Sequence, residues 1–95
     1  MFIMAWVYIL KCSDGSYYTG SAIDLEKRLA EHNNGIFDGY TAKRLPIELV
    51  FCYEMPGIHE AFLKERQIKG WSRIKKEALI NGEWNKLIDY SKSKK

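Results

Sequence analysis

Runs of apolar and alternating residues along the chain predict three β-strands. Residues 5–12 are rich in aromatic and β-branched side chains and end at Ser-Asp-Gly-Ser, and residues 17–22 follow as the hairpin partner. A third run, residues 47–53, begins directly after Pro46. The apolar run at the N-terminus is too short to span a bilayer and lacks a basic leader region, so it is assigned to the first strand and no membrane contact is expected.

Capping residues and helical spacing predict three helices. Asp24 can cap a helix that ends at about Asn34, where Asn-Asn-Gly stops it. A second helix is predicted over residues 58–69, with a glycine directly after it. Ser72 can cap a third, short helix that ends near Asn81.

The segments between and after these elements lack clear periodicity. Residues 36–45 are expected to form a loop, residues 83–90 to add one or two helical turns, and residues 91–95 to form a frayed, basic polar tail. Trp84 is expected to lie in the core. The chain has 95 residues and is 46% hydrophobic. It is therefore expected to fold as one domain, residues 1–90, with one modest core.

Charge and cysteine content narrow the class of protein only slightly. The net charge of +3 is compatible with a nucleic-acid partner and equally with an ordinary surface. Cys12 and Cys52 lie in two predicted strands and show neither a CxxC pair nor zinc-site spacing. Both are therefore predicted to be buried, reduced thiols of a cytoplasmic protein.

The length of the first hairpin loop decides whether Tyr8 and Tyr18 can act together. A two- or four-residue loop would place the two phenols on opposite faces of the sheet. A three-residue loop, residues 13–15, pairs Tyr8 with Gly20 and Tyr18 with Leu10, so that both phenols share one face. That loop type favours a left-handed glycine at its last position, as found here, and is therefore predicted.

Two polar side chains interrupt the apolar face of the first predicted helix. Arg28 and His32 lie in one stripe with Leu25 and Leu29, at helical spacing. An arginine directed toward the sheet requires an anion, because a buried unpaired cation is costly. Alternatively, Arg28 extends to the surface or pairs with a nearby acid. His32 is consistent with a hydrogen-bonded structural role as well as with a catalytic one.

The second predicted helix carries one carboxylate, Glu65, in a stripe that is expected to face inward. A glutamate on an apolar face is usually partnered. The partner is either Arg28, which would make the pair structural, or a divalent cation, which would make it functional. The other members of the stripe are Ile58, Ala61, Phe62 and Ile68.

Two further groups of residues combine cations with aromatic rings. Such groups suit contact with the phosphates or bases of a nucleic acid. The alternatives are a solvated loop for the first group and, for the second, a tryptophan packed between helices. The first group is Tyr40, Lys43 and Arg44, and the second is Lys69, Arg73, Lys75 and Lys76 around Trp71.

Taken in order, these residues resemble the GIY-YIG nuclease domain. Residues 6–8 (Trp-Val-Tyr) stand where the family has Gly-Ile-Tyr, and residues 18–20 (Tyr-Thr-Gly) stand where it has Tyr-Ile-Gly. Residues 18–35 are similar to the strand, the arginine-bearing helix and the His-Asn-x-Gly ending of the family. Residues 65–76 resemble the end of the domain in small stand-alone bacterial members, so the match covers nearly the whole chain.

The resemblance implies an α+β fold, in which a small three-stranded antiparallel sheet is flanked by three or more helices. It also implies an endonuclease that hydrolyses DNA with Mg²⁺ or Mn²⁺, as in repair or recombination. Arg28 matches the catalytic arginine of the family and Glu65 its metal-binding glutamate. Tyr8 and Tyr18 match the two motif tyrosines, and His32 matches a position that is Tyr or His in relatives.

Phosphodiester hydrolysis is consistent with these roles. A cation on Glu65 would polarise a phosphate oxygen, and the guanidinium fork of Arg28 can hold two phosphate oxygens. A free tyrosine has a pKa of about 10, so a neighbouring cation would have to lower it for the phenol to act as a base. Either Tyr8 or Tyr18 is therefore expected to orient and deprotonate water, with His32 assisting.

The chain also departs from the family pattern. Trp6 replaces the first glycine, and no lysine follows the second motif, so that a basic group such as Lys43 would have to serve instead. Neither Asn81 nor Asn85 aligns clearly with the late asparagine of some relatives. The chain is too short to hold a separate DNA-binding domain as well, so specificity would come from DNA shape, a homodimer or a partner protein. The alternative function is a non-catalytic nucleic-acid-binding or interaction module.

Overall fold

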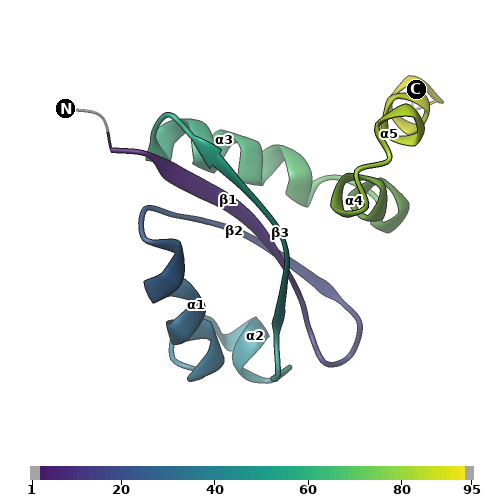
Figure 1. The fold of residues 1–95 in the computed structure, drawn as a ribbon. Helices are drawn as coiled ribbons and strands as arrows, with labels where there is room; N and C mark the ends of the chain where they lie inside the picture. The colour runs from purple at the N-terminus through teal and green to yellow at the C-terminus, as the bar shows by residue number, and fades with distance from the viewer. Residues whose placement is uncertain (1–2, 94–95) are drawn as a thin grey trace.

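A computed structural model describes residues 3–93 and, among them, the side chains of residues 3–88. Three antiparallel strands form one sheet in the order β2-β1-β3. Five helices surround the sheet (Figure 1), so the predicted α+β class is confirmed. The strands are β1 (Ala5–Lys11), β2 (Tyr17–Ala22) and β3 (Glu48–Met55), and the helices are α1 (Leu25–Asn33), α2 (Gly39–Ala42), α3 (Ile58–Lys69), α4 (Arg73–Ile80) and α5 (Trp84–Ser93).

The two faces of the sheet are covered by different helices. In Figure 1, α1 and α2 lie on one side of the sheet and α3 lies on the other, with α4 and α5 beyond its end. Because side chains alternate along a strand, the central strand β1 supplies both layers. Val7 and Ile9 pack with Ile68 of α3 in one buried cluster, whereas Tyr8 and Leu10 pack toward α1 in the other.

The β1–β2 hairpin has the predicted three-residue loop. The backbone N–H of Cys12 donates to the carbonyl of Ser16 over 2.8 Å, and Gly15 has the left-handed φ of +85° that this loop requires. Tyr8 lies opposite Gly20 in the resulting register, and Tyr18 lies opposite Leu10. Both phenols therefore share the α1 face, as the prediction required.

The prediction of a loop over residues 36–45 is wrong in part, because this segment contains the one-turn helix α2. The Asp38 side chain caps that helix by accepting from the backbone N–H of Tyr40 over 2.7 Å. A helix of one turn is too short to show a hydrophobic period, so periodicity alone does not predict it. The consequence is that residues 38–41 are held beside α1.

The C-terminal part also differs from the prediction. Helix α5 extends to Ser93, so residues 91–93 are helical rather than frayed, and residues 94–95 lie outside the described part of the chain. Trp84, which was expected in the core, is 57% exposed. Its helix packs mainly against α4, and Leu87 rather than Trp84 packs against the core cluster of Val7 and Ile9. In the described part of the chain, no helix is long and apolar enough to cross a membrane.

Three predicted core positions are at the surface. Helix α3 packs on the sheet through Ala61, Glu65 and Ile68 alone, a stripe narrower than predicted. Ile58 and Phe62 flank this stripe and are 44% and 45% exposed. Cys12 is buried as predicted, but Cys52 is exposed, because it lies on the edge strand β3.

Candidate active site

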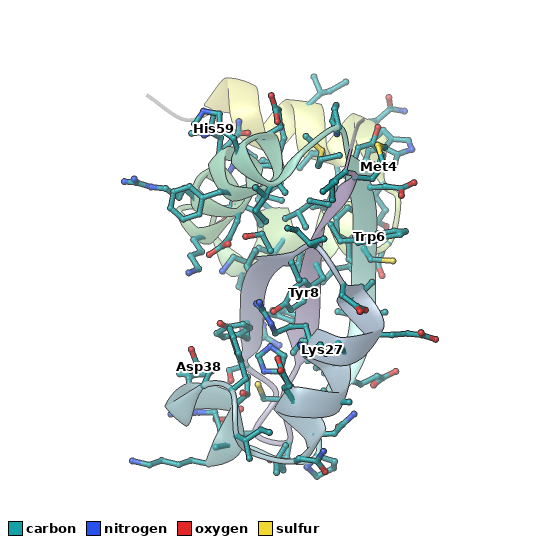
Figure 2. The ribbon with its side chains drawn as sticks, turned by 90° about the vertical axis from the view of Figure 1, so that its left-hand side faces the viewer. Met4, Trp6, Tyr8, Lys27, Asp38 and His59 are labelled. Atoms are coloured by element: carbon teal, nitrogen blue, oxygen red, sulfur yellow. The ribbon has the colours of Figure 1, made fainter. Side chains whose placement is uncertain are left out.

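A buried chain of hydrogen bonds links β1, α1 and α2. The phenol oxygen of Tyr8 lies 2.9 Å from Nε2 of His32, and Nδ1 of the same ring lies 2.8 Å from Oγ1 of Thr41. The Thr41 hydroxyl in turn donates to the carbonyl of Asp38 over 3.2 Å. Tyr8, His32 and Thr41 are all fully buried, and Figure 2 shows Tyr8 in the middle of the molecule with Asp38 on the α2 side. Two residues from the sequence prediction, Tyr8 and His32, are thus in direct contact.

Tyr18 lies beside Tyr8 but has a different environment. The two rings are 6.5 Å apart, and the Tyr18 phenol donates to Oδ2 of Asp38 over 3.2 Å. Burial raises the pKa of Tyr18 well above its usual value, and the nearby Tyr8 and Asp38 raise it further. Tyr18 is therefore held as a proton donor, which makes it a poor base.

Arg28 and burial set the protonation of the Tyr8–His32 pair. Burial raises the pKa of Tyr8, whereas the hydrogen bond and the charge of Arg28 oppose that rise. Burial, followed by the Arg28 charge, lowers the pKa of His32 below its usual 6.5. The imidazole is therefore neutral near pH 7 and can accept a proton.

Arg28 is held at the edge of the site by three contacts. Its Nη1 donates to the carbonyl of Ser21 over 3.0 Å, and its Nε lies 3.4 Å from Oε1 of Glu31. The guanidinium also lies 3.9 Å from the ring centroid of Phe37. The side chain keeps 25% exposure, so part of the guanidinium faces solvent. Arg28 therefore both pairs with an acid, as one interpretation expected, and remains available to an anion.

Glu65 is the buried carboxylate of the site. Ser21 Oγ donates to its Oε1 over 2.5 Å, and Lys69 Nζ lies 2.7 Å from its Oε2. The cation that pairs with Glu65 is thus Lys69 rather than Arg28. Ser21 connects the two sides of the site, because its carbonyl binds Arg28 and its hydroxyl binds Glu65.

The donor set around Glu65 matches a cation that retains water. In the described part of the chain, no group of three or more His, Cys, Asp or Glu side chains could enclose a metal ion. Mg²⁺ usually binds one or two carboxylates and completes its shell with water and substrate phosphates. Glu65 is a suitable single carboxylate for that mode, provided that Lys69 moves away from Oε2.

Only some of the loop residues predicted to contact nucleic acid lie beside the site. Tyr40 stacks on Tyr18 with a centroid distance of 6.2 Å and therefore adjoins the site. Arg44 lies over the Tyr40 ring at 3.8 Å and also binds Asp14 over 3.0 Å. Lys43 is exposed at the C-cap of α2, so the lysine within the site is Lys69 instead.

Of the predicted basic group around Trp71, Lys69 pairs with Glu65. The members of the group on α4 lie away from Tyr8 and His32. Arg73 pairs with Glu77 over 3.2 Å and lies 4.7 Å from the ring centroid of Tyr17. Lys75 Nζ lies 4.3 Å from the ring of Trp71, which is itself partly buried against the core. These side chains can extend a basic surface from the site, but none of their contacts reaches Tyr8 or Glu65. The asparagines considered from the sequence are also remote, with Asn81 at the C-cap of α4 and Asn85 in α5.

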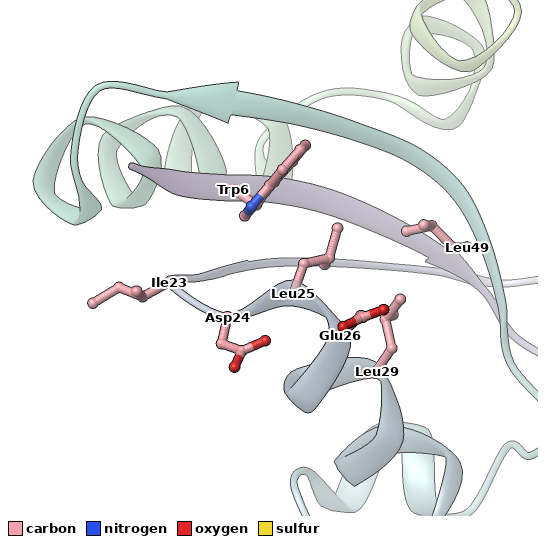
Figure 3. Close-up of a pocket in the computed structure, with 7 residues that line it drawn as sticks. All are labelled: Trp6, Ile23, Asp24, Leu25, Glu26, Leu29 and Leu49. Atoms are coloured by element: carbon pink, nitrogen blue, oxygen red, sulfur yellow. The ribbon is translucent and has the colours of Figure 1, made fainter. Parts of the chain in front are cut away.

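Two hollows lie near the N-terminal end of α1. The larger, of about 610 Å³, is lined mostly by apolar side chains and also by two carboxylates, Asp24 and Glu26 (Figure 3). Carboxylates repel phosphate, so this hollow is not a phosphate site. The smaller, of about 310 Å³, is lined by two cations, Lys27 and Arg28, and also by two carboxylates, Asp24 and Glu31. The smaller hollow therefore leaves Arg28 accessible from outside, but its lining is not selective for an anion.

A family model for the GIY-YIG catalytic domain matches residues 4–78 of the chain. The chain belongs to the GIY-YIG family. This confirms the resemblance and places the protein in a nuclease family. The match begins just before β1 and ends within α4, so it contains Tyr8, Tyr18, Arg28, His32 and Glu65.

Small relatives of this GIY-YIG domain occur in bacteria and archaea. A UPF0213 protein of Staphylococcus saprophyticus is 47% identical over 76 residues, which cover 80% of this chain and 93% of the relative. A UPF0213 protein of Halobacterium salinarum is 45% identical over 81% of this chain and 100% of the relative. The solution NMR structure of a UPF0213 protein from Bacillus halodurans is 41% identical, with a TM-score of 0.54 over 82% of this chain and 83% of that one.

Several residues of this GIY-YIG site were not predicted from the sequence. Asp38 and Ser21 contact site residues through hydrogen bonds that join distant segments. Asp38 had one usable signal, since an aspartate before a short Gly-Tyr-Thr-Ala segment is a typical helix cap. Phe37 also had a usable signal, because it is an aromatic residue in a segment that was predicted to be a loop.

Gly20, the glycine of the second GIY-YIG motif, leaves room for the Tyr8 phenol. A Cβ at this position would overlap the Tyr8 phenol oxygen and lie 2.6 Å from Cζ of that ring. We expect Gly20→Ala to lower the free energy of unfolding by about 1–3 kcal/mol, because the buried ring has to shift. Chemical denaturation measures this loss. Gly39→Ala is the matched control, since a Cβ there meets nothing within 4 Å; an equal loss in both variants would contradict the explanation.

Proposed function

We propose that the protein is a metal-dependent endonuclease that hydrolyses DNA phosphodiester bonds. The observation that carries the proposal is the hydrogen bond between the Tyr8 phenol and the buried imidazole of His32, beside the Arg28 guanidinium. A phenol bonded to a neutral histidine can pass its proton on at the moment it takes one up. This arrangement removes the need for a stable phenolate and supports Tyr8, rather than Tyr18, as the base.

The proton balance of the step follows from the two hydrogen bonds. The attacking water gives a proton to the Tyr8 oxygen while the Tyr8 proton passes to Nε2 of His32, so that His32 becomes an imidazolium ion. The resulting hydroxide forms the new P–O bond as the bond to the leaving oxygen breaks, and the leaving alkoxide takes a proton from solvent water. His32 then returns its extra proton to solvent through Tyr8, which restores the starting state. Arg28, bound through one N–H to the Ser21 carbonyl, offers its remaining N–H groups to the phosphate oxygens and offsets their charge.

Glu65 is the residue that would hold Mg²⁺ or Mn²⁺. When bound, the cation supplies positive charge for a non-bridging phosphate oxygen and for the leaving oxygen. Ser21 fixes one carboxylate oxygen and so orients the carboxylate. Lys69 neutralises Glu65 in the free protein, and the released ammonium would lie close enough to contact the substrate phosphate.

Exposed rings beside the site favour a substrate with unpaired bases. Phe37 and Tyr40 are 39% and 38% exposed, and each is stacked with an arginine. Aromatic rings of this kind stack on bases that have left the duplex. Branched, nicked or single-stranded DNA offers such bases, which is consistent with a role in repair or recombination. Arg73 and Lys75 would then contact the backbone further along the strand.

The test is cleavage of a supercoiled plasmid, a branched oligonucleotide and a single strand at increasing Mg²⁺ or Mn²⁺. We expect Glu65→Gln to raise the metal concentration for half-maximal cutting by about tenfold or more, because one charged ligand is lost. Glu60→Gln, at an exposed position of the same helix, should leave that concentration unchanged. Salt-sensitive DNA binding with no metal-dependent cutting by the wild type would contradict the proposal and indicate a binding module.

A further inference from the structure

Thr41 has one hydroxyl proton and two oxygen-containing or nitrogen-containing neighbours. The carbonyl of Asp38, which also accepts from the backbone N–H of Ala42 over 2.9 Å, lies 3.2 Å from the hydroxyl and can accept its proton. In this arrangement the Thr41 oxygen offers a lone pair to Nδ1 of His32, 2.8 Å away. The proton of this second hydrogen bond is then carried by Nδ1 of the imidazole.

The other end of the ring accommodates the same tautomer. The Tyr8 phenol oxygen lies 2.9 Å from Nε2 of His32, and with the ring proton on Nδ1 this nitrogen is able to accept the phenol proton.

We propose that Thr41 is a positioning residue, which fixes His32 as the Nδ1–H tautomer and so leaves Nε2 to accept the Tyr8 proton. In the opposite tautomer, Nε2–H would donate to the Tyr8 oxygen and occupy the lone pair that receives the proton from water. The tautomer assignment rests on the direction of the Thr41 hydrogen bonds, whereas its catalytic consequence rests on the proposed nuclease function.

The location of Thr41 explains how the short helix α2 contributes to the site. Asp38 caps α2, binds Tyr18 through its side chain and accepts the Thr41 proton through its carbonyl. Thr41 and His32 are both fully buried, so water does not compete for either side of their hydrogen bond. One turn of helix thereby sets the hydrogen-bond direction across the whole Tyr8–His32 pair.

The first test is ¹⁵N NMR of the two histidines at a pH where both are neutral. The chain has only His32 and His59, and His59 is exposed, so it serves as the reference for an unconstrained ring. In the wild type we expect Nδ1 of His32 to resonate as protonated and Nε2 as unprotonated. A His32 ring protonated at Nε2, or one with both tautomers populated as in His59, would overturn the proposal.

The second test compares two substitutions at Thr41. Thr41→Val keeps the shape but removes the acceptor, and we expect kcat to fall about 10- to 100-fold with KM unchanged, as for other outer residues that orient a catalytic histidine. Thr41→Ser keeps the hydroxyl and should restore both kcat and the wild-type His32 tautomer. Equal losses in Val and Ser variants, or a Val variant that keeps the Nδ1–H tautomer, would contradict the assignment. If the wild type shows the expected tautomer but cuts no DNA, the nuclease proposal fails while the tautomer assignment stands.

Discussion

Tyr8→Phe is expected to lower kcat by about a thousandfold, within the range that positioned general bases contribute. The substitution removes the oxygen that is hydrogen-bonded to His32 Nε2 and retains the ring. Single-turnover cleavage under saturating metal measures the loss, and a denaturation curve checks that the fold is retained. Tyr18→Phe is the matched control on the neighbouring strand, and we expect a much smaller loss because that phenol donates to Asp38.

The pH dependence of kcat/KM is a second test of Tyr8 as the base. Because the pKa of His32 is lowered, kcat/KM should stay constant on the acid side until the pH falls below 6.5, and should then decrease as the imidazole gains a proton. Tyr8→Phe should abolish this dependence, since His32 no longer has a proton to accept. An active Tyr8→Phe variant together with an inactive Tyr18→Phe variant would show that Tyr18 is the base.

Arg28→Lys is expected to lower kcat by about 100- to 1,000-fold, as when one preorganised donor to a transition-state oxygen is lost. The planar guanidinium uses one N–H for the Ser21 carbonyl and directs others outward, whereas an ammonium cannot maintain both contacts with the same geometry. The charge is unchanged, so DNA binding should weaken little. Separate measurement of kcat and of the DNA dissociation constant distinguishes the two effects.

The control for this substitution is Arg66→Lys. Arg66 also lies over an aromatic ring, 5.9 Å from the centroid of Phe62, but on the exposed side of α3. We expect it to retain wild-type cleavage. If Arg28→Lys also cut within about twofold of the wild type, Arg28 would act only as a diffuse positive charge.

Local signals allowed part of this site to be predicted from the sequence. The shared face of Tyr8 and Tyr18 follows from one turn glycine and the alternation of side chains in a hairpin, both of which are properties of neighbouring residues. Arg28 and Glu65 were noticed because a charge interrupts a helical stripe. The short helix α2 shows no period, so the role of Thr41 could not be found in the same way.

The features that the sequence did not predict are contacts between elements far apart in the chain, which depend on how those elements pack. Ser21 meets Glu65 across 44 positions, and the sequence gives no sign of that hydrogen bond. Phe62 and Trp84 were assigned to the core on hydrophobicity, yet the narrow contact face of α3 and the outlying position of α5 leave both exposed. Hydrophobic type predicts which residues can be buried, while the arrangement of the helices decides which are.

Ser21 binds the two charged groups of the site through different parts of the residue. The bond to Arg28 uses a main-chain oxygen, which every amino acid possesses, whereas the bond to Glu65 uses the hydroxyl. Sequence drift at position 21 can therefore alter how the carboxylate is oriented while the arginine keeps its anchor. If the proposed cation binds at Glu65, its requirement can then diverge between lineages at a single position, while the contact that anchors Arg28 is retained.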